Sequence, residues 1–144
     1  MGVVIQQRRV SQTVLLQPTV IVPNGVPLLR GQAVAIRQVV DHQEYALCGA
    51  LLVDFADLFY GFLSEDGVPG EVAPVVTGRG SVVSPVVEVG QVLTPECPVF
   101  LSVVPGCVTP VPPQGVSEAK VLRVGTALTS SSMFLVTDDY YWVP

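Results

Sequence analysis

The stretch TGRGSVVSPVVEVGQVLTPECPVFLSVVPGCVTPVPP, residues 77–113, decides the fold class. Valines occur singly or in pairs, and Pro, Gly or Thr-Pro interrupts them every few residues. Valine branches at Cβ and fits a pleated sheet better than a helix. Proline cannot donate a hydrogen bond inside a sheet, so it belongs at strand starts, at edges or in bulges. The stretch therefore predicts a series of short strands whose edges are blunted against aggregation.

The same pattern extends through the rest of the chain, in which 31 of 144 residues are valine. Strand candidates recur at a spacing typical of all-β proteins: GQAVAIR, EVAPVV, SVVSPVVEV, PVFLSVV, AKVLRVGTAL and SMFLVT. EYALCGALL fits a strand or a short helix, and VDFADLFYGF fits one helical turn that Asp54 caps and Gly61 ends. TGRGS is typical of a hairpin turn, and no tandem repeat is evident. We therefore expect an all-β protein: a small β-barrel or sandwich of short strands with an extended N-terminal arm and at most one short helix.

The expected organisation has two parts. Residues 1–30 form the N-terminal arm and the first extended segments, and residues 31–144 form the β-barrel domain. Charged residues make up only 13% of the chain, about half of the usual ~25%. Such a composition predicts that part of the apolar surface meets another chain. No segment is long and apolar enough for a membrane helix, and the start has no secretory layout, so we expect a soluble, non-exported protein.

Charge is distributed unevenly along the chain. Residues 1–40 carry four arginines and no acid, namely Arg8, Arg9, Arg30 and Arg37. The remaining residues carry all 12 acids against three bases, so that +4 and −9 give the net charge of −5. A basic leading segment on an acidic body indicates contact with an acidic protein surface, such as a neighbouring copy. Direct nucleic-acid binding is disfavoured because the body would repel phosphate, and a solvated arm without a partner is the alternative.

The tail TDDYYWVP places Tyr140, Tyr141 and Trp142 almost at the last residue. Tyrosine and tryptophan bury large rigid surfaces and retain one polar group, which suits interfaces. Two interpretations stay open. The tail is either a last strand on its own barrel or a contact with a neighbour.

No catalytic pattern is found, so we expect no enzyme, no cofactor and no metal site. The single histidine, His42, lies between Asp41 and Glu44 without a nucleophile motif, which favours a solvated polar loop. The three cysteines, Cys48, Cys97 and Cys107, are expected to be buried free thiols, although Cys97 and Cys107 would face each other across a hairpin. The segment SPVVEVGQVLTPECPVFLSV has a Val-rich strand, a glycine turn and a second strand, and this order is similar to that of biotinyl and lipoyl carrier domains. Those domains need a lysine displayed in a hairpin. The only lysine, Lys120, lies inside the predicted strand AKVLRV.

Four segments carry a resemblance to a known family: LLRGQAVAI, GFLSEDGVPGEVAPVVTGRGSVV, GQVLTPECPVFLSVVPGCVTPVPPQ and AKVLRVGTALTSSSMFLV. From about Gly31 onward, their succession of strands, glycines and Pro-Val segments resembles the capsid decoration (cement) proteins of tailed bacteriophages. The proline density, the aromatic insert at residues 55–62 and the YYW tail depart from that family.

The resemblance implies a virion structural protein on the outer surface of the phage capsid, made in the host cytoplasm. It implies a homo-oligomer, with a trimer favoured, that clamps adjacent subunits of the major capsid protein. Two alternatives stay open. One is a phage tail, collar or head-fibre component with a similar β-barrel, and the other is a barrel module that binds a small ligand.

Overall fold

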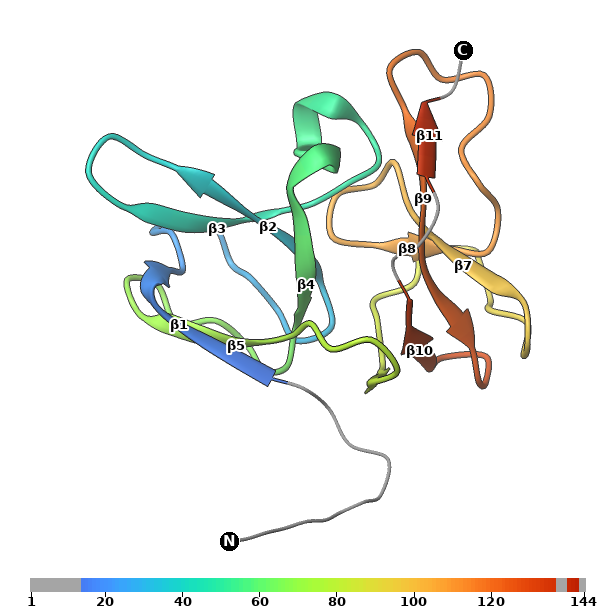
Figure 1. The fold of residues 1–144 in the computed structure, drawn as a ribbon, viewed down its shortest axis with the longest axis horizontal. Coiled ribbons are helices and arrows are strands. Elements are labelled where there is room, and N and C mark those ends of the chain that lie inside the picture. Colours follow the sequence, from blue (N-terminus) through green and yellow to red (C-terminus); the bar gives the residue numbers. More distant parts are fainter. Residues whose placement is uncertain (1–13, 137–139, 143–144) are drawn as a thin grey trace, which may run out of the picture.

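The computed structural model describes residues 14–136 and 140–142, and it confirms the all-β fold class (Figure 1). The first strands close into a five-stranded barrel in the order β1-β3-β2-β4-β5, with β1 paired to β5. Their bounds are β1 (Val14–Ile21), β2 (Ala33–Gln38), β3 (Gln43–Leu47), β4 (Phe59–Leu63) and β5 (Val72–Val76). The boundary expected at residue 30 therefore does not coincide with a boundary in the structure, because β1 precedes it and belongs to the same barrel as β2.

The remaining strands form a second sheet beside the barrel (Figure 1). It runs in the order β6-β10-β9-β7-β8, and β11 also pairs with β9. The bounds are β6 (Val82–Val83), β7 (Pro98–Leu101), β8 (Val108–Thr109), β9 (Lys120–Ala127), β10 (Met133–Leu135) and β11 (Tyr140–Trp142). An isolated parallel bridge joins Val87 to Val108. This bridge connects the segment after β6 to β8, so the second sheet is almost closed as well.

Side chains alternate along β2 between two hydrophobic clusters. Val34 is fully buried in the interior of the first barrel, together with Tyr45 of β3. Ala33 and Ala35, on the opposite face of β2, belong to a cluster that also contains Leu101 and other residues of the second sheet. Successive residues of a strand point to opposite faces, so β2 is buried on both sides. One of the two clusters is therefore the interior of the first barrel, and the other is shared between the barrel and the second sheet.

Two turns replace the single helical turn expected in VDFADLFYGF. They are the three-residue 3₁₀ helices η1 (Leu52–Asp54) and η2 (Ala56–Leu58). Asp54 does not cap a helix, because it ends η1 and no side-chain cap hydrogen bond is present there. Phe55, between the two turns, adopts a left-handed conformation with φ 64°. The left-handed residue prevents a continuous helix, and β4 then begins at Phe59.

The prolines lie mostly where their chemistry predicts. Pro98 is the first residue of β7, and Pro85 separates β6 from the bridge at Val87. Pro74 lies inside β5, where it is the last partner of β1 before the register shifts. The TGRGS segment forms the predicted tight turn, in which the Ser81 N–H donates to the Gly78 carbonyl at 3.0 Å, but the predicted hairpin was wrong. The segment links β5 of the first barrel to β6, whose strand partner is β10.

Candidate functional site

Large apolar side chains are exposed in loops of both sheets, in the 3₁₀ turns η1 and η2, and at the start of β5. Three of them are the most exposed: Val40 is 100% exposed, Val89 is 97% exposed and Val53 is 73% exposed. The others that are at least about a third exposed are Val26, Leu29, Leu52, Leu58, Val68, Val72, Val92, Val104 and Val111. Sequence reasoning missed these residues, because valine in this chain is equally common in the core. A glycine next to Val26 and another next to Val89, at positions 25 and 90, are local signs that these two valines lie in loops.

Two of the four arginines predicted for an interface are described, and they lie at opposite ends of β2. Arg30 precedes the strand in an exposed loop, where its backbone N–H donates to Asp66 Oδ1 at 2.8 Å. Arg37 lies near the other end of β2 and donates from Nη2 to Glu44 Oε1 at 2.9 Å. The two side chains therefore do not form one basic patch. Arg8 and Arg9 lie outside the described residues.

The aromatic tail is a strand of its own sheet. Strand β11 pairs antiparallel with β9, with Tyr140 opposite Leu122, Tyr141 opposite Val121 and Trp142 opposite Lys120. Of the two interpretations of the tail, the last-strand interpretation matches this pairing. Contact of the tail with a neighbouring chain stays a prediction.

A network of charged groups occupies the hairpin between β2 and β3. The imidazole of His42 contacts Asp41 through Nδ1 at 2.6 Å and Glu44 through Nε2 at 3.0 Å. Hydrogen bonds with Glu44 and then Asp41 raise the pKa of His42 above its usual value. The bond to His42 lowers the pKa of Asp41, and His42 and then Arg37 lower the pKa of Glu44. Both ring nitrogens of His42 contact carboxylates, so Asp41, His42 and Glu44 form a polar hairpin tip beside the exposed Val40.

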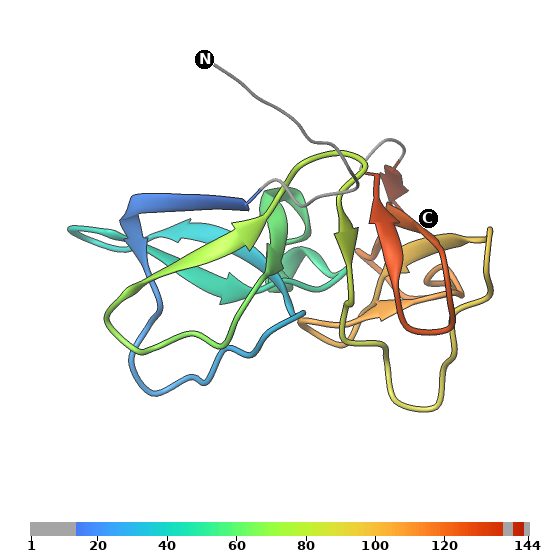
Figure 2. The same cartoon turned by 90° about the horizontal axis from the view of Figure 1, so that it is seen from below.

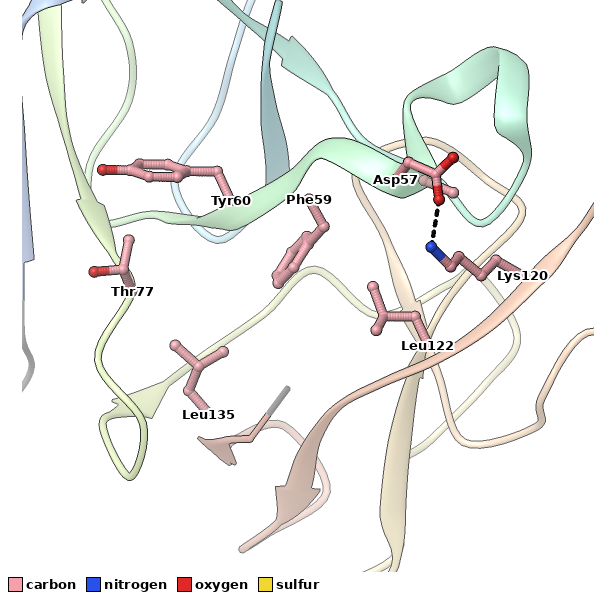
Figure 3. A pocket seen from close by; sticks show the side chains of 8 residues that line it. Asp57, Phe59, Tyr60, Thr77, Lys120, Leu122 and Leu135 are labelled. Carbon is pink, nitrogen blue, oxygen red and sulfur yellow. Dashed lines mark hydrogen bonds and ion pairs between the residues drawn. The ribbon is translucent and has the colours of Figure 1, made fainter. Parts of the chain in front are cut away.

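A pocket of about 190 Å³ lies where the first barrel meets the second sheet (Figure 3). Its lining comes from η2, β4, β9 and β10 and from the residue that follows β5: Ala56, Asp57, Phe59, Tyr60, Thr77, Lys120, Leu122 and Leu135. Nζ of Lys120 donates to Asp57 Oδ1 at one end of the pocket (Figure 3). The Lys120 side chain is 7% exposed, whereas that of Asp57 is 47% exposed. The lysine is therefore buried in an ion pair within a strand, which is unlike the displayed lysine of a carrier domain.

The cysteines differ in their exposure. Cys48 is buried, and burial raises the pKa of its thiol to about 12. Cys107 is partly buried, and burial also raises the pKa of that thiol. Cys97 is exposed, so the expectation of three buried thiols was wrong at this position. It precedes β7 in a tight turn, where its backbone N–H donates to the Thr94 carbonyl at 3.1 Å. All three are free thiols.

Among residues 14–136 and 140–142, no group of three or more His, Cys, Asp or Glu side chains is arranged to hold a metal ion. Within the same residues, no helix has the length and apolar character needed to cross a membrane. Comparison with known proteins gave no family model, no curated protein and no solved structure that matches the chain significantly.

Proposed function

We propose that the chain is a structural protein of a bacteriophage virion. In this proposal it is a decoration protein that binds the outer surface of the capsid. It stabilises contacts between subunits of the major capsid protein and acts as a homo-oligomer, with a trimer favoured. The observation that carries the proposal is the exposure of valine and leucine in loops of both sheets, on a chain with only 13% charged residues.

Exposed apolar residues support binding to protein because they group rather than scatter. Val26 and Leu29 lie in the loop before β2, and Val68 lies in the loop between β4 and β5. A hydrogen bond of 2.8 Å from the Gly67 N–H to the Leu28 carbonyl joins these two loops. Exposed apolar residues gathered on adjoining loops favour an interaction site.

The family resemblance supplies the identity of the proposed partner. Its four segments coincide with paired strands in the structure: the first with β2, the second with β4, β5 and β6, the third with β7 and β8, and the fourth with β9 and β10. A protein that binds only the assembled shell stabilises it by mass action. The gain is about 2.7 kcal/mol per site at a free concentration 100-fold above Kd.

A small-ligand function has weaker support. The pocket beside Asp57 and Lys120 has a volume of about 190 Å³, below the ~300 Å³ at which ordinary ligand pockets begin. The experiment that follows distinguishes a location on the head from a location in the tail, collar or head fibres.

The test is co-sedimentation of the purified chain with expanded empty heads and, separately, with isolated tails of the phage whose genome carries the gene. We expect saturable binding to heads, none to tails, and a higher melting temperature for decorated heads. Binding to tails alone would establish the alternative location, and binding to neither would refute a virion role.

The basic arm is tested in the same assay. Deletion of residues 1–11 should weaken binding to heads and leave the circular dichroism spectrum and thermal melt of the chain unchanged, because these residues precede β1. Unchanged affinity would show that Arg8 and Arg9 make no contact with the capsid.

A further inference from the structure

The two sheets have the same strand pairing. In the first barrel, β1 pairs with β3 in parallel and with β5 antiparallel, while β2 pairs with β3 and β4, and β4 with β5. In the second sheet, the segment of residues 82–88 takes the place of β1. It pairs in parallel with β8 through Val87 and antiparallel with β10 through β6. Strand β7 pairs with β8 and β9, and β9 with β10. Every pair keeps its order and its direction.

The correspondence holds residue by residue over residues 22–36 and 87–101, which are 65 positions apart. Both segments begin with a turn whose glycine has positive φ, 81° at Gly25 and 88° at Gly90. Both then bury a leucine, at positions 28 and 93, and reach a second residue with positive φ. That residue is Gly31 at 86° in the first segment and Glu96 at 70° in the second.

Hydrogen bonds around the second turn are also the same. The N–H of Gly31 donates to the Leu63 carbonyl at 2.8 Å, and the N–H of Glu96 donates to the Ala127 carbonyl at 2.8 Å. The return bonds correspond too: Leu63 N–H to the Gln32 carbonyl at 3.1 Å, and Ala127 N–H to the Cys97 carbonyl at 2.9 Å.

A register shift marks the same place in both sheets. Val34 pairs with Gly61, and the next residue of β2 pairs with Phe59, so one residue of β4 is skipped. Val99 pairs with Gly125, and the next residue of β7 pairs with Arg123, so one residue of β9 is skipped. A β-bulge at one position is a specific feature. Its recurrence beside a glycine in both sheets indicates that the two sheets are copies of one unit, and not merely two small sheets of similar size.

The corresponding loops expose apolar side chains. Val26 is 46% and Leu29 50% exposed in the loop before β2, and Val89 is 97% and Val92 65% exposed in the loop before β7. Both loops project at the lower edge of Figure 2, the first from the barrel and the second from the other sheet. One side of the molecule therefore presents the same backbone loop twice, and each copy exposes two apolar side chains, although at different positions of the loop.

We propose that the chain consists of two copies of one five-stranded unit, and that the two apolar loops bind two identical, weakly charged surfaces of a repeating protein lattice. This inference rests on the proposed function and specifies its partner. Each chain bridges two equivalent sites on neighbouring subunits, with one site for each unit. Two linked sites bind more tightly than either alone because the second contact forms at a high effective concentration.

The test uses three variants of the full chain: V26D/L29D in the first loop, V89D/V92D in the second, and all four substitutions together. Binding of each to expanded heads is measured by co-sedimentation over a concentration series. We expect either double variant to bind about 100-fold more weakly, in line with the loss of one of two linked sites, and the quadruple variant to show no binding.

Q114D/S117D is the matched control, because both residues are exposed polar residues outside both loops and the variant adds the same two charges. We expect it to bind like the wild type. Thermal melts verify that each variant folds, as all substituted side chains are exposed. If the wild type binds heads and only one loop matters, or neither does, the bivalent proposal is overturned and the decoration role stands. If the wild type does not bind heads, both proposals are overturned.

Discussion

Gly61 gives the sharpest test of how closely the strands pack. A methyl group at this position would overlap the carbonyl oxygen of Val76 and would lie 2.7 Å from Val75 Cγ1. Strand β5 carries both residues and is held from its other side by β1. The strand therefore has no room to retreat, and we expect Gly61→Ala to destabilise the protein.

The magnitude follows from two opposing terms. Overpacking of this kind costs up to about 3 kcal/mol, and the stiffer unfolded chain of alanine returns about 0.7 kcal/mol. The net loss is about 2 kcal/mol. For a chain of this length the entropy of unfolding is about 0.3 kcal/mol/K, so the melting temperature should fall by about 7 °C.

Gly80→Ala is the matched control. A methyl group there meets nothing within 4 Å, but the residue has φ 85°. The left-handed strain of about 1–2 kcal/mol, offset by about 0.7 kcal/mol from the unfolded chain, should lower the melting temperature by about 2 °C. The assay is a thermal melt by circular dichroism or calorimetry. A Gly61→Ala protein that melts within 2 °C of the wild type, or above Gly80→Ala, would refute the steric argument.

Three further predictions concern other positions. Gly31→Ala should lower the melting temperature more than Glu96→Ala, because a methyl group at residue 31 would lie 2.6 Å from the Ser84 carbonyl oxygen, whereas Glu96 already has a Cβ at its φ of 70°; equal losses in thermal melts would contradict this. The raised pKa of His42 stabilises the fold fully below the unfolded value of 6.5, and this stabilisation is lost as the pH rises through the folded value. The lowered pKa values of Asp41 and Glu44 stabilise the fold above their unfolded values of 3.8 and 4.5, and this stabilisation is lost as the pH falls through the folded values. His42→Gln should therefore lower the melting temperature most near about pH 5.5 and little near about pH 9, and a loss independent of pH would argue against the network. Cys97 should react with a thiol reagent in the native protein while Cys48 reacts only after unfolding, as peptide mass mapping would establish; labelling of Cys48 in the folded chain would contradict its burial.

The sequence predicted the all-β class because valine spacing and proline placement are local properties that report on single strands. It predicted β2, β5, β7, β9 and β10 at nearly their observed bounds. The sequence did not predict how the strands divide between two sheets. The local pattern of TGRGS is typical of a hairpin, and only the long-range strand pairing shows that this segment links the barrel to the second sheet.

The internal repeat was hidden for a similar reason. Equivalent positions carry different side chains, such as the buried Gly31 and the exposed Glu96, or the buried Ala33 and the exposed Pro98, while the positive φ of the turn residues is kept. The exposed valines of the candidate surface were equally hidden, since hydrophobicity alone does not distinguish Val89, which is 97% exposed, from Val99, which is fully buried.

The hydrophobic cluster that both sheets share has a consequence for the distance between the two apolar loops. Residues of both sheets share one cluster, and the Val86 N–H donates to the Gly31 carbonyl at 3.0 Å across the junction. Neither unit can rotate without breaking these contacts, so the two loops keep a constant separation. Under the proposed bivalent binding, affinity depends on the repeat distance of the shell, and a shell that expands as it matures acquires or loses matching sites while the chain itself stays the same.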